Sequence, residues 1–458
     1  MWKPIFNRPF RAKAFAAIEA VAAALLPRTE GSNGKDDARA PRAKKFRRRR
    51  ADASLAGGTA GIAILYGYLS QARTGLRDNE IALCFLKQAA DAVSALPMDS
   101  SLYEGFTGVA WSVAHLRTWL LDPDDNSTES IDQILNRSLS CKPWRGCYDL
   151  VSGLVGFGAY ALEQLPRPLA IECLKEVINR LDEIAERNAE GITWFTPPHM
   201  LIDSQRKIHP NGYYDLGVAH GVPGVIALLG RVCSLKVDRA AMLAETQAKA
   251  QSLLDGAVPW LLTQKLMPKT NSIFPHFTGP SIRSPAPSRV AWCYGDLGIA
   301  VALLAAASRG NKAKWKEEAL RLARDVARRP ESDSGVKDCG LCHGAAGVGH
   351  LFNRLFQGTG EPVFKQAARS WFERTLRLRR DSQGIAGFFA LGVGSNGQLR
   401  SIPKIGLLQG ATGVALALLA AATDVEPNWD RMMMISIPPK RGPVSDISAR
   451  TATRSPHT

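Results

Sequence analysis

The sequence predicts an all-α protein in which seven helical hairpins close into a ring, with apolar helices inside and amphipathic helices outside. Three observations support this fold class. A Gly-x-x-Gly motif followed by an apolar run occurs seven times in 458 residues. Each copy opens a segment that is apolar nearly all round, which is typical of a buried helix. Amphipathic segments lie between most of the copies, as expected for helices that cover a core.

The glycine motif marks the start of each predicted inner helix. Segments such as 62–65 and 414–419 follow it directly and contain only Ala, Ile, Val and Leu. A glycine in the first turn allows close approach of neighbouring backbones and leaves space for a ligand. The seven glycine pairs are Gly58/Gly61, Gly105/Gly108, Gly153/Gly156, Gly221/Gly224, Gly295/Gly298, Gly344/Gly347 and Gly410/Gly413.

The predicted outer helices have charged residues on one face and apolar residues on the other. The clearest examples cover residues 169–187, 240–264, 312–329 and 363–379. Residues 9–26 are expected to be the outer partner of the first copy. An open solenoid is the alternative, but its terminal helices need polar caps. Because the first and last inner helices are as apolar as the others, we favour a closed ring with a funnel at the glycine-rich end.

The distribution of charge divides the chain into four predicted parts. Of the net charge of +16, residues 1–50 contribute +10, from 14 Lys/Arg and 4 Asp/Glu. Residues 1–27 are predicted to form an outer helix of the ring, residues 28–50 a basic insertion that is disordered, residues 51–422 the ring domain, and residues 423–458 a tail. Nucleic-acid binding is not expected, since no segment outside the basic one resembles a motif that recognises nucleotide bases. A weak membrane contact through the basic insertion stays open.

The composition favours a cytoplasmic protein with reduced thiols. There is no run of eighteen apolar residues, so an integral membrane protein is excluded. The apolar stretch 14–26 follows basic residues, but Glu19 interrupts it, which argues against an export signal. Association with a membrane-bound biosynthetic complex is the alternative location.

Two of the seven motif copies carry residues that suit a metal ion. Cys293 and Cys342 each lie two residues before the first glycine of their copy, and His343 follows Cys342. Equivalent positions of adjacent repeats meet at the mouth of the predicted ring. Two thiolates and one imidazole suit Zn²⁺, and three protein ligands leave a fourth position open, as in catalytic sites. The C-x-x-C-H run that ends at His343 also fits haem attachment, but that chemistry requires export.

Other polar residues are predicted at the same mouth. His220 and Tyr294 occupy the position just before the first glycine, as His343 does. Asp149 lies four residues before Gly153, so it is a candidate partner of His220 in an acid–base pair. Arg289 lies four residues before Cys293 and is a candidate for stabilising developing negative charge.

The motifs Trp-Cys-Tyr-Gly at 292–295 and Cys-His-Gly at 342–344, with the seven glycine-rich helix starts, resemble the lanthionine synthetase C-like family of lanthipeptide cyclases. The resemblance spans roughly residues 9–422 and implies an α/α toroid of seven hairpins with a central zinc ion. It implies that Cys293, Cys342 and His343 are the zinc ligands. It also places His220, Asp149, Arg289 and Tyr294 at active-site positions.

The resemblance implies a zinc-dependent cyclase that acts on a precursor peptide whose Ser and Thr residues have been dehydrated. The enzyme would add peptide Cys thiolates to dehydroalanine or dehydrobutyrine to form lanthionine and methyllanthionine. The expected partners are this peptide, a separate dehydratase, because 458 residues leave no room for a fused one, and an exporter. The alternatives are addition of a glutathione-type thiol to dehydrated residues, and a non-catalytic zinc-bound scaffold for peptides or membranes.

Overall fold

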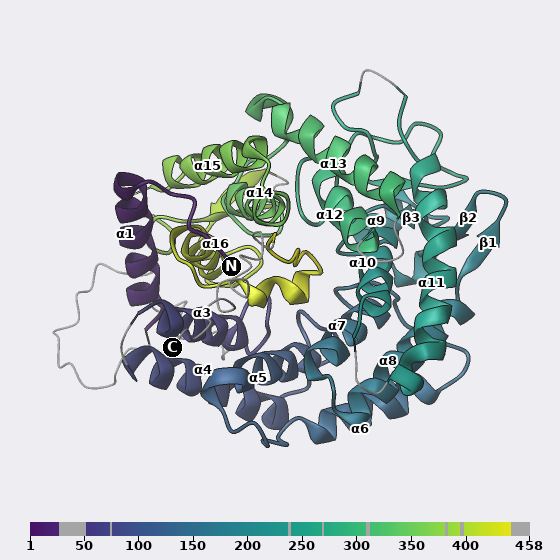
Figure 1. Ribbon diagram of the computed structural model, residues 1–458, viewed down its shortest axis with the longest axis horizontal. Coiled ribbons are helices and arrows are strands. Elements are labelled where there is room, and N and C mark those ends of the chain that lie inside the picture. The colour runs from purple at the N-terminus through teal and green to yellow at the C-terminus, as the bar shows by residue number, and fades with distance from the viewer. Residues whose placement is uncertain are drawn as a thin grey trace, which may run out of the picture.

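The computed structural model shows the predicted α/α toroid (Figure 1). It describes residues 1–26, 52–73, 76–236, 240–267, 270–307, 312–380, 383–393 and 398–440. The basic insertion predicted for residues 28–50 lies outside these residues. Within them, seven inner helices form the inner barrel: α3 (Thr59–Ala72), α5 (Phe106–Leu120), α7 (Leu154–Gln164), α10 (Val222–Cys233), α12 (Asp296–Ala306), α14 (Ala345–Thr359) and α16 (Ala411–Ala422).

The inner helices form a closed ring. Each packs against the next one along the chain, and α16 returns to pack against α3. Their side chains are buried around most of the helix surface, as in α16, where all twelve residues are buried. This closure rules out the open solenoid for the described part of the chain.

The outer helices are amphipathic and cover the inner barrel. Helices α4, α8, α11, α13 and α15 each pack against the inner helix that precedes them, while α6 packs against α5 and α8. In α13, Leu322 and Val326 face the core, whereas the opposite face carries Lys, Arg and Glu. The bounds are α1 (Arg8–Leu25), α4 (Leu76–Ala95), α6 (Glu129–Ser140), α8 (Pro168–Glu183), α11 (Ala240–Thr263), α13 (Ala313–Arg328) and α15 (Pro362–Arg377).

The partner of the N-terminal helix differs from the expectation. Helix α1 is an outer helix, as predicted, but it packs mainly against α16, the seventh inner helix, and meets the first, α3, only at its end, where the hydroxyl of Tyr66 donates to the carbonyl of Ala22 at 2.6 Å. The backbone N–H of Ile5 donates to the carbonyl of Ala421 at 2.9 Å, and the indole of Trp2 donates to that of Ala420 at 2.7 Å. Each outer helix follows its inner helix in the chain, so the only inner helix left for α1 is the last one.

The glycine repeat has a steric cause in the loops that precede the inner helices. A Cβ atom on Gly108 would lie 1.9 Å from the carbonyl oxygen of Leu102, six residues earlier. A Cβ on Gly413 would lie 1.9 Å from the oxygen of Leu407 in the same way. The second glycine of every copy meets the carbonyl six residues before it. Each loop therefore folds back against its own helix start, and only glycine leaves room for this.

The seven loops are joined by a hydrogen-bond ring, made by residues two positions before the first glycine of each copy. For example, the N–H of Ala56 donates to the carbonyl of Tyr103 at 2.9 Å, and the N–H of Leu408 donates back to Ala56 at 3.1 Å. In the second loop the donor is the preceding residue, Leu102, at 3.2 Å from the oxygen of Val151. The members are Ala56, Tyr103, Val151, Ala219, Cys293, Cys342 and Leu408.

The connections also contain short elements that the sequence did not predict. Three antiparallel two-stranded sheets pair β1 (Glu186–Asn188) with β2 (Gly191–Thr193), β3 (Tyr214–Asp215) with β4 (Phe277–Thr278), and β5 (Ala390–Val393) with β6 (Leu399–Ile402). The remaining helices are short: α9 (Asp203–Ile208), η1 (Pro198–Met200), η2 (Glu331–Asp333) and η3 (Asn428–Met433).

The residues after α16 fill the middle of the ring (Figure 1). We call residues 423–440 the central segment; the rest of the predicted tail lies outside the described residues. Asp430 in η3 accepts hydrogen bonds from His350 at 2.8 Å and from Arg354 at 2.6 Å, and all three side chains are buried. The indole of Trp292 donates to the carbonyl of Met433 at 2.9 Å. This part of the chain is therefore core and contacts the loop that carries Cys293.

The described helices contain no segment long and apolar enough to cross a membrane.

Candidate active site

The hydrogen-bond ring brings the two candidate cysteine ligands together. Cys293 lies in the loop before α12 and Cys342 in the loop before α14, and these are adjacent loops of the ring. The N–H of Cys293 donates to the carbonyl of Cys342 at 3.3 Å, and the N–H of Cys342 donates to that of Leu408 at 2.8 Å. Gly295, with φ of 99°, adopts a backbone conformation that favours glycine and turns the chain into α12. Both cysteine backbones are thus fixed by ring contacts.

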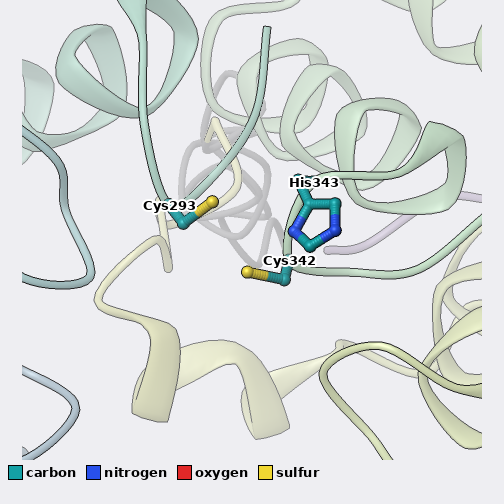
Figure 2. Close-up of side chains that lie close together, drawn as sticks. All are labelled: Cys293, Cys342 and His343. Atoms are coloured by element: carbon teal, nitrogen blue, oxygen red, sulfur yellow. The ribbon is translucent and has the colours of Figure 1, made fainter. Parts of the chain in front are cut away.

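The side chains of Cys293, Cys342 and His343 point toward one another (Figure 2). One ligand atom from each lies within 4.8 Å of the other two, and no second such group of His, Cys, Asp and Glu occurs among the described residues. Cys293 is buried, whereas Cys342 and His343 are partly exposed. The three sequence-predicted ligands are therefore adjacent, and two of them are partly exposed.

The chemistry of this group fits a cation. The neighbouring Cys342 thiol and His343 hold the pKa of Cys293 well below its usual value, while the contact with Cys293 raises the pKa of Cys342. The two opposite directions are those expected when one thiol donates a hydrogen bond to the other sulfur. Two thiolates with one imidazole form a donor set that zinc prefers.

His220 and Asp149 form a hydrogen-bonded pair in neighbouring loops. Nδ1 of His220 lies 2.7 Å from Oδ2 of Asp149, and Oδ1 of Asp149 accepts from the N–H of Ser152 at 2.6 Å. Burial alone would lower the pKa of His220, but the hydrogen bond and charge of Asp149, with Asp215 nearby, raise it to about 9. The His220 side chain is 42% exposed. It is therefore a protonated group that a substrate can reach.

Tyr294 has a different partner. Its hydroxyl donates to Oδ2 of Asp215 at 2.8 Å, and Oδ1 of Asp215 accepts from the N–H of Gly217 at 2.7 Å. Burial raises the pKa of Asp215 to about 7. Burial and Asp215 raise the pKa of Tyr294 well above its usual value, so the phenol keeps its proton.

Arg289 lies beside the cysteine pair. Its charge contributes to the lowered pKa of Cys293, and it adds to the effect of burial in lowering the pKa of His276. Its Nε is buried and has no hydrogen-bond partner among the described atoms. Arg289 therefore places a positive charge near the two cysteines.

Two carboxylates of the site, Asp215 and Asp338, were not among the predicted residues. Asp338 is buried, and its Oδ2 lies 3.5 Å from Nε2 of His343. The signal was present, because four copies have aspartate six residues before the first glycine, namely Asp52, Asp99, Asp215 and Asp338. Arg289 occupies the same position in the fifth copy. Comparing the copies at this position would have shown both residues.

Comparisons with known proteins agree with the fold and the motifs. A family model described as lanthionine synthetase C-like protein matches residues 50–434. The nisin biosynthesis protein NisC of Lactococcus lactis subsp. lactis is 25% identical over an alignment of 288 residues, and the match covers 56% of this chain. This match spans 63% of that relative. A solved structure of nisin cyclase has a TM-score of 0.66 at 18% identity, over 86% of this chain and 94% of that one.

Proposed function

This chain belongs to the lanthionine synthetase C-like family, and we propose that it closes thioether rings in a dehydrated precursor peptide. The observation that carries the proposal is the meeting of Cys293, Cys342 and His343 beside the His220–Asp149 pair. A thiol activator and a proton donor on neighbouring loops are what addition of a thiol to an alkene requires.

Cys293, Cys342 and His343 would hold zinc and leave one coordination position open. Bound there, zinc supplies acidity to a peptide cysteine, since a coordinating thiol is deprotonated. Cys342 and His343 are partly exposed, so a peptide cysteine can reach the group.

The reaction forms a bond between the cysteine sulfur and the β-carbon of dehydroalanine or dehydrobutyrine. The C=C electron pair moves toward the α-carbon and the adjacent carbonyl, and an enolate develops. Arg289, whose positive charge acts on Cys293, supplies charge to stabilise that oxygen. Protonated His220 then gives its proton to the α-carbon, and Asp149 orients the imidazole through Nδ1. The product is a lanthionine or methyllanthionine of unchanged mass.

An assay with a dehydrated peptide that contains one cysteine tests the proposal. The peptide is incubated with zinc-loaded protein, treated with a thiol-alkylating reagent and weighed by mass spectrometry. Ring closure prevents alkylation and leaves the mass unchanged. A second sample that contains glutathione tests the alternative, because a glutathione adduct increases the mass. If every cysteine stays alkylatable and no adduct forms, the proposed activity is wrong.

Variants separate the two roles in the site. We expect Cys293→Ala to lose zinc and activity together. His220→Ala should keep about one zinc per chain and lose ring closure. Matched controls are Cys84→Ala and His199→Ala, since both residues are exposed and outside the ring loops. Loss of zinc from His220→Ala would contradict the assignment of His220 as a proton donor.

The partners follow from the same proposal. A dehydrated precursor peptide requires a dehydrating activity, which we assign to a separate enzyme, with an exporter acting on the product. We propose a cytoplasmic site of action. The division into an outer helix at 1–27, an insertion at 28–50, a cyclase domain at 51–422 and a C-terminal part at 423–458 also stays a proposal.

A further inference from the structure

The carboxylate of Asp338 lies behind the histidine of the cysteine–histidine group. Asp338 precedes His343 by five residues in the same loop, and its side chain is 3% exposed. Oδ2 faces Nε2 of His343 at 3.5 Å and also accepts from the N–H of Leu391 in β5 at 3.4 Å. Oδ1 accepts from the N–H of Gly340 at 3.2 Å. The carboxylate is therefore held from two sides while it faces the imidazole.

One of these contacts is a general feature of the loops. The equivalent aspartates Asp52, Asp99 and Asp215 each accept, through Oδ1, a hydrogen bond from the N–H two residues later. The bond from Gly340 to Asp338 is the same contact, so it explains an aspartate at this position without any ligand. The contact of Oδ2 with His343 has no counterpart at Asp52 or Asp99, whose copies carry Gly57 and Glu104 where His343 stands.

The contact between Asp338 and His343 determines which ring nitrogen of His343 carries the proton. A carboxylate accepts hydrogen bonds, so the nitrogen that faces it carries the proton. Nε2 is therefore the N–H, and Nδ1 keeps the lone pair. Figure 2 shows one ring nitrogen on the side of the two sulfur atoms and the other turned away from them. Histidines that bind metals commonly donate their second N–H to a carboxylate, which fixes the tautomer and raises the basicity of the ligand.

We propose that Asp338 is a positioning residue for the metal, which holds His343 so that Nδ1 is the ligand atom. The inference rests on the proposed function, because it requires that Cys293, Cys342 and His343 bind zinc. It adds a residue that contacts neither the metal nor the peptide and that acts through His343.

Zinc affinity measured by competition with a chelator tests this role. Asp338→Asn keeps an oxygen for the N–H of Gly340 but presents an amide N–H to His343 and Leu391. We expect it to bind zinc about 10- to 100-fold more weakly than the unmodified protein. The matched control is Asp99→Asn, which makes the same change in a loop without a ligand and should leave the affinity unchanged. Thermal melts of the metal-free proteins show whether both variants fold like the unmodified chain.

A second measurement needs no variant. Long-range ¹H–¹⁵N spectra of the zinc-loaded protein, labelled in histidine, report which nitrogen of His343 is protonated. We expect a protonated Nε2 and a metal-bound Nδ1. A metal-bound Nε2, or equal zinc affinity of a folded Asp338→Asn and the unmodified protein, would overturn the inference and leave the proposed function intact. An unmodified protein that binds no zinc would overturn the metal site of the proposed function itself.

Discussion

Replacing Asp149 by asparagine should change the pH range in which His220 is protonated. Asp149 is the chief group that raises the pKa of His220, through a contact of 2.7 Å, to about 9. The asparagine keeps a side-chain oxygen that can accept from the N–H of Ser152, so the loop should keep its conformation. An opposite charge at this distance commonly shifts a pKa by about 1–3 units. We therefore expect the pKa of His220 to fall to about 7 in the variant.

The fall in pKa predicts a loss of activity that depends on pH. At pH 8 a group with a pKa of about 9 is about 90% protonated, and one with a pKa of about 7 is about 10% protonated. If His220 donates the proton, the rate of ring closure at pH 8 should fall about tenfold. At pH 6 His220 is mostly protonated in both proteins, so the rate of ring closure by the variant should approach that of the unmodified enzyme.

The His220–Asp149 pair also makes the folding stability of the protein depend on pH. The folded pKa of His220 is raised, so its contribution is fully present below the ordinary histidine pKa of 6.5 and is lost as the pH rises through about 9. Since 42% of the side chain is exposed, solvent screens the pair, and we expect a contribution of only about 1 kcal/mol. Denaturant unfolding at pH 6 and pH 10 measures this difference between the two proteins.

The assay combines NMR titration of His220 with rates of ring closure from pH 6 to pH 9. The control is Asp91→Asn, which removes an exposed carboxylate that is paired with Lys87 on α4. An unchanged pKa of His220 in Asp149→Asn would refute the electrostatic argument. An equal loss of rate at pH 6 and pH 8 would show that Asp149 acts by orientation alone.

Three further predictions concern stability. Gly108→Ala should destabilise the fold by at least about 1–3 kcal/mol, because its Cβ would collide with the carbonyl of Leu102, and chemical denaturation measures this. Asp430→Ala should cost about 3–5 kcal/mol, since it removes the buried carboxylate that pairs with both Arg354 and His350; a melting temperature equal to that of the unmodified protein would contradict this. Removal of zinc should lower the free energy of unfolding, by about 4 kcal/mol relative to a sample with free zinc at about 1,000 times its Kd. Calorimetry with and without chelator tests the last point.

The ring could be predicted from the sequence because its constraint is local and repeated. A glycine is needed wherever a loop passes close to its own helix start, so the second glycine of each copy, such as Gly108 or Gly413, appears in the sequence. The same register placed Cys293 and Cys342 in adjacent loops. Whether these residues bind metal is a separate question that zinc analysis answers.

Other features depend on contacts between distant segments and leave no periodic pattern. The pairing of α1 with α16 joins the two ends of the ring, and the spacing of the repeats does not specify it. The central segment has one short apolar cluster around Trp429 and Met432, too brief to indicate a helix, and its burial follows from the space that the inner barrel encloses. The repeat marks the position of Asp338, but it does not specify the contact between its Oδ2 and His343, which only the folded loop shows.

The pairing of the first and last helices has a consequence for biosynthesis. Helix α1 is translated long before α16, the inner helix that covers most of its apolar face, which includes Ala14, Ile18 and Val21. That face stays uncovered on the nascent chain while nearly 400 further residues are added. We therefore expect the growing polypeptide to bind a chaperone that shields apolar helices, and to reach its native state only after translation of α16.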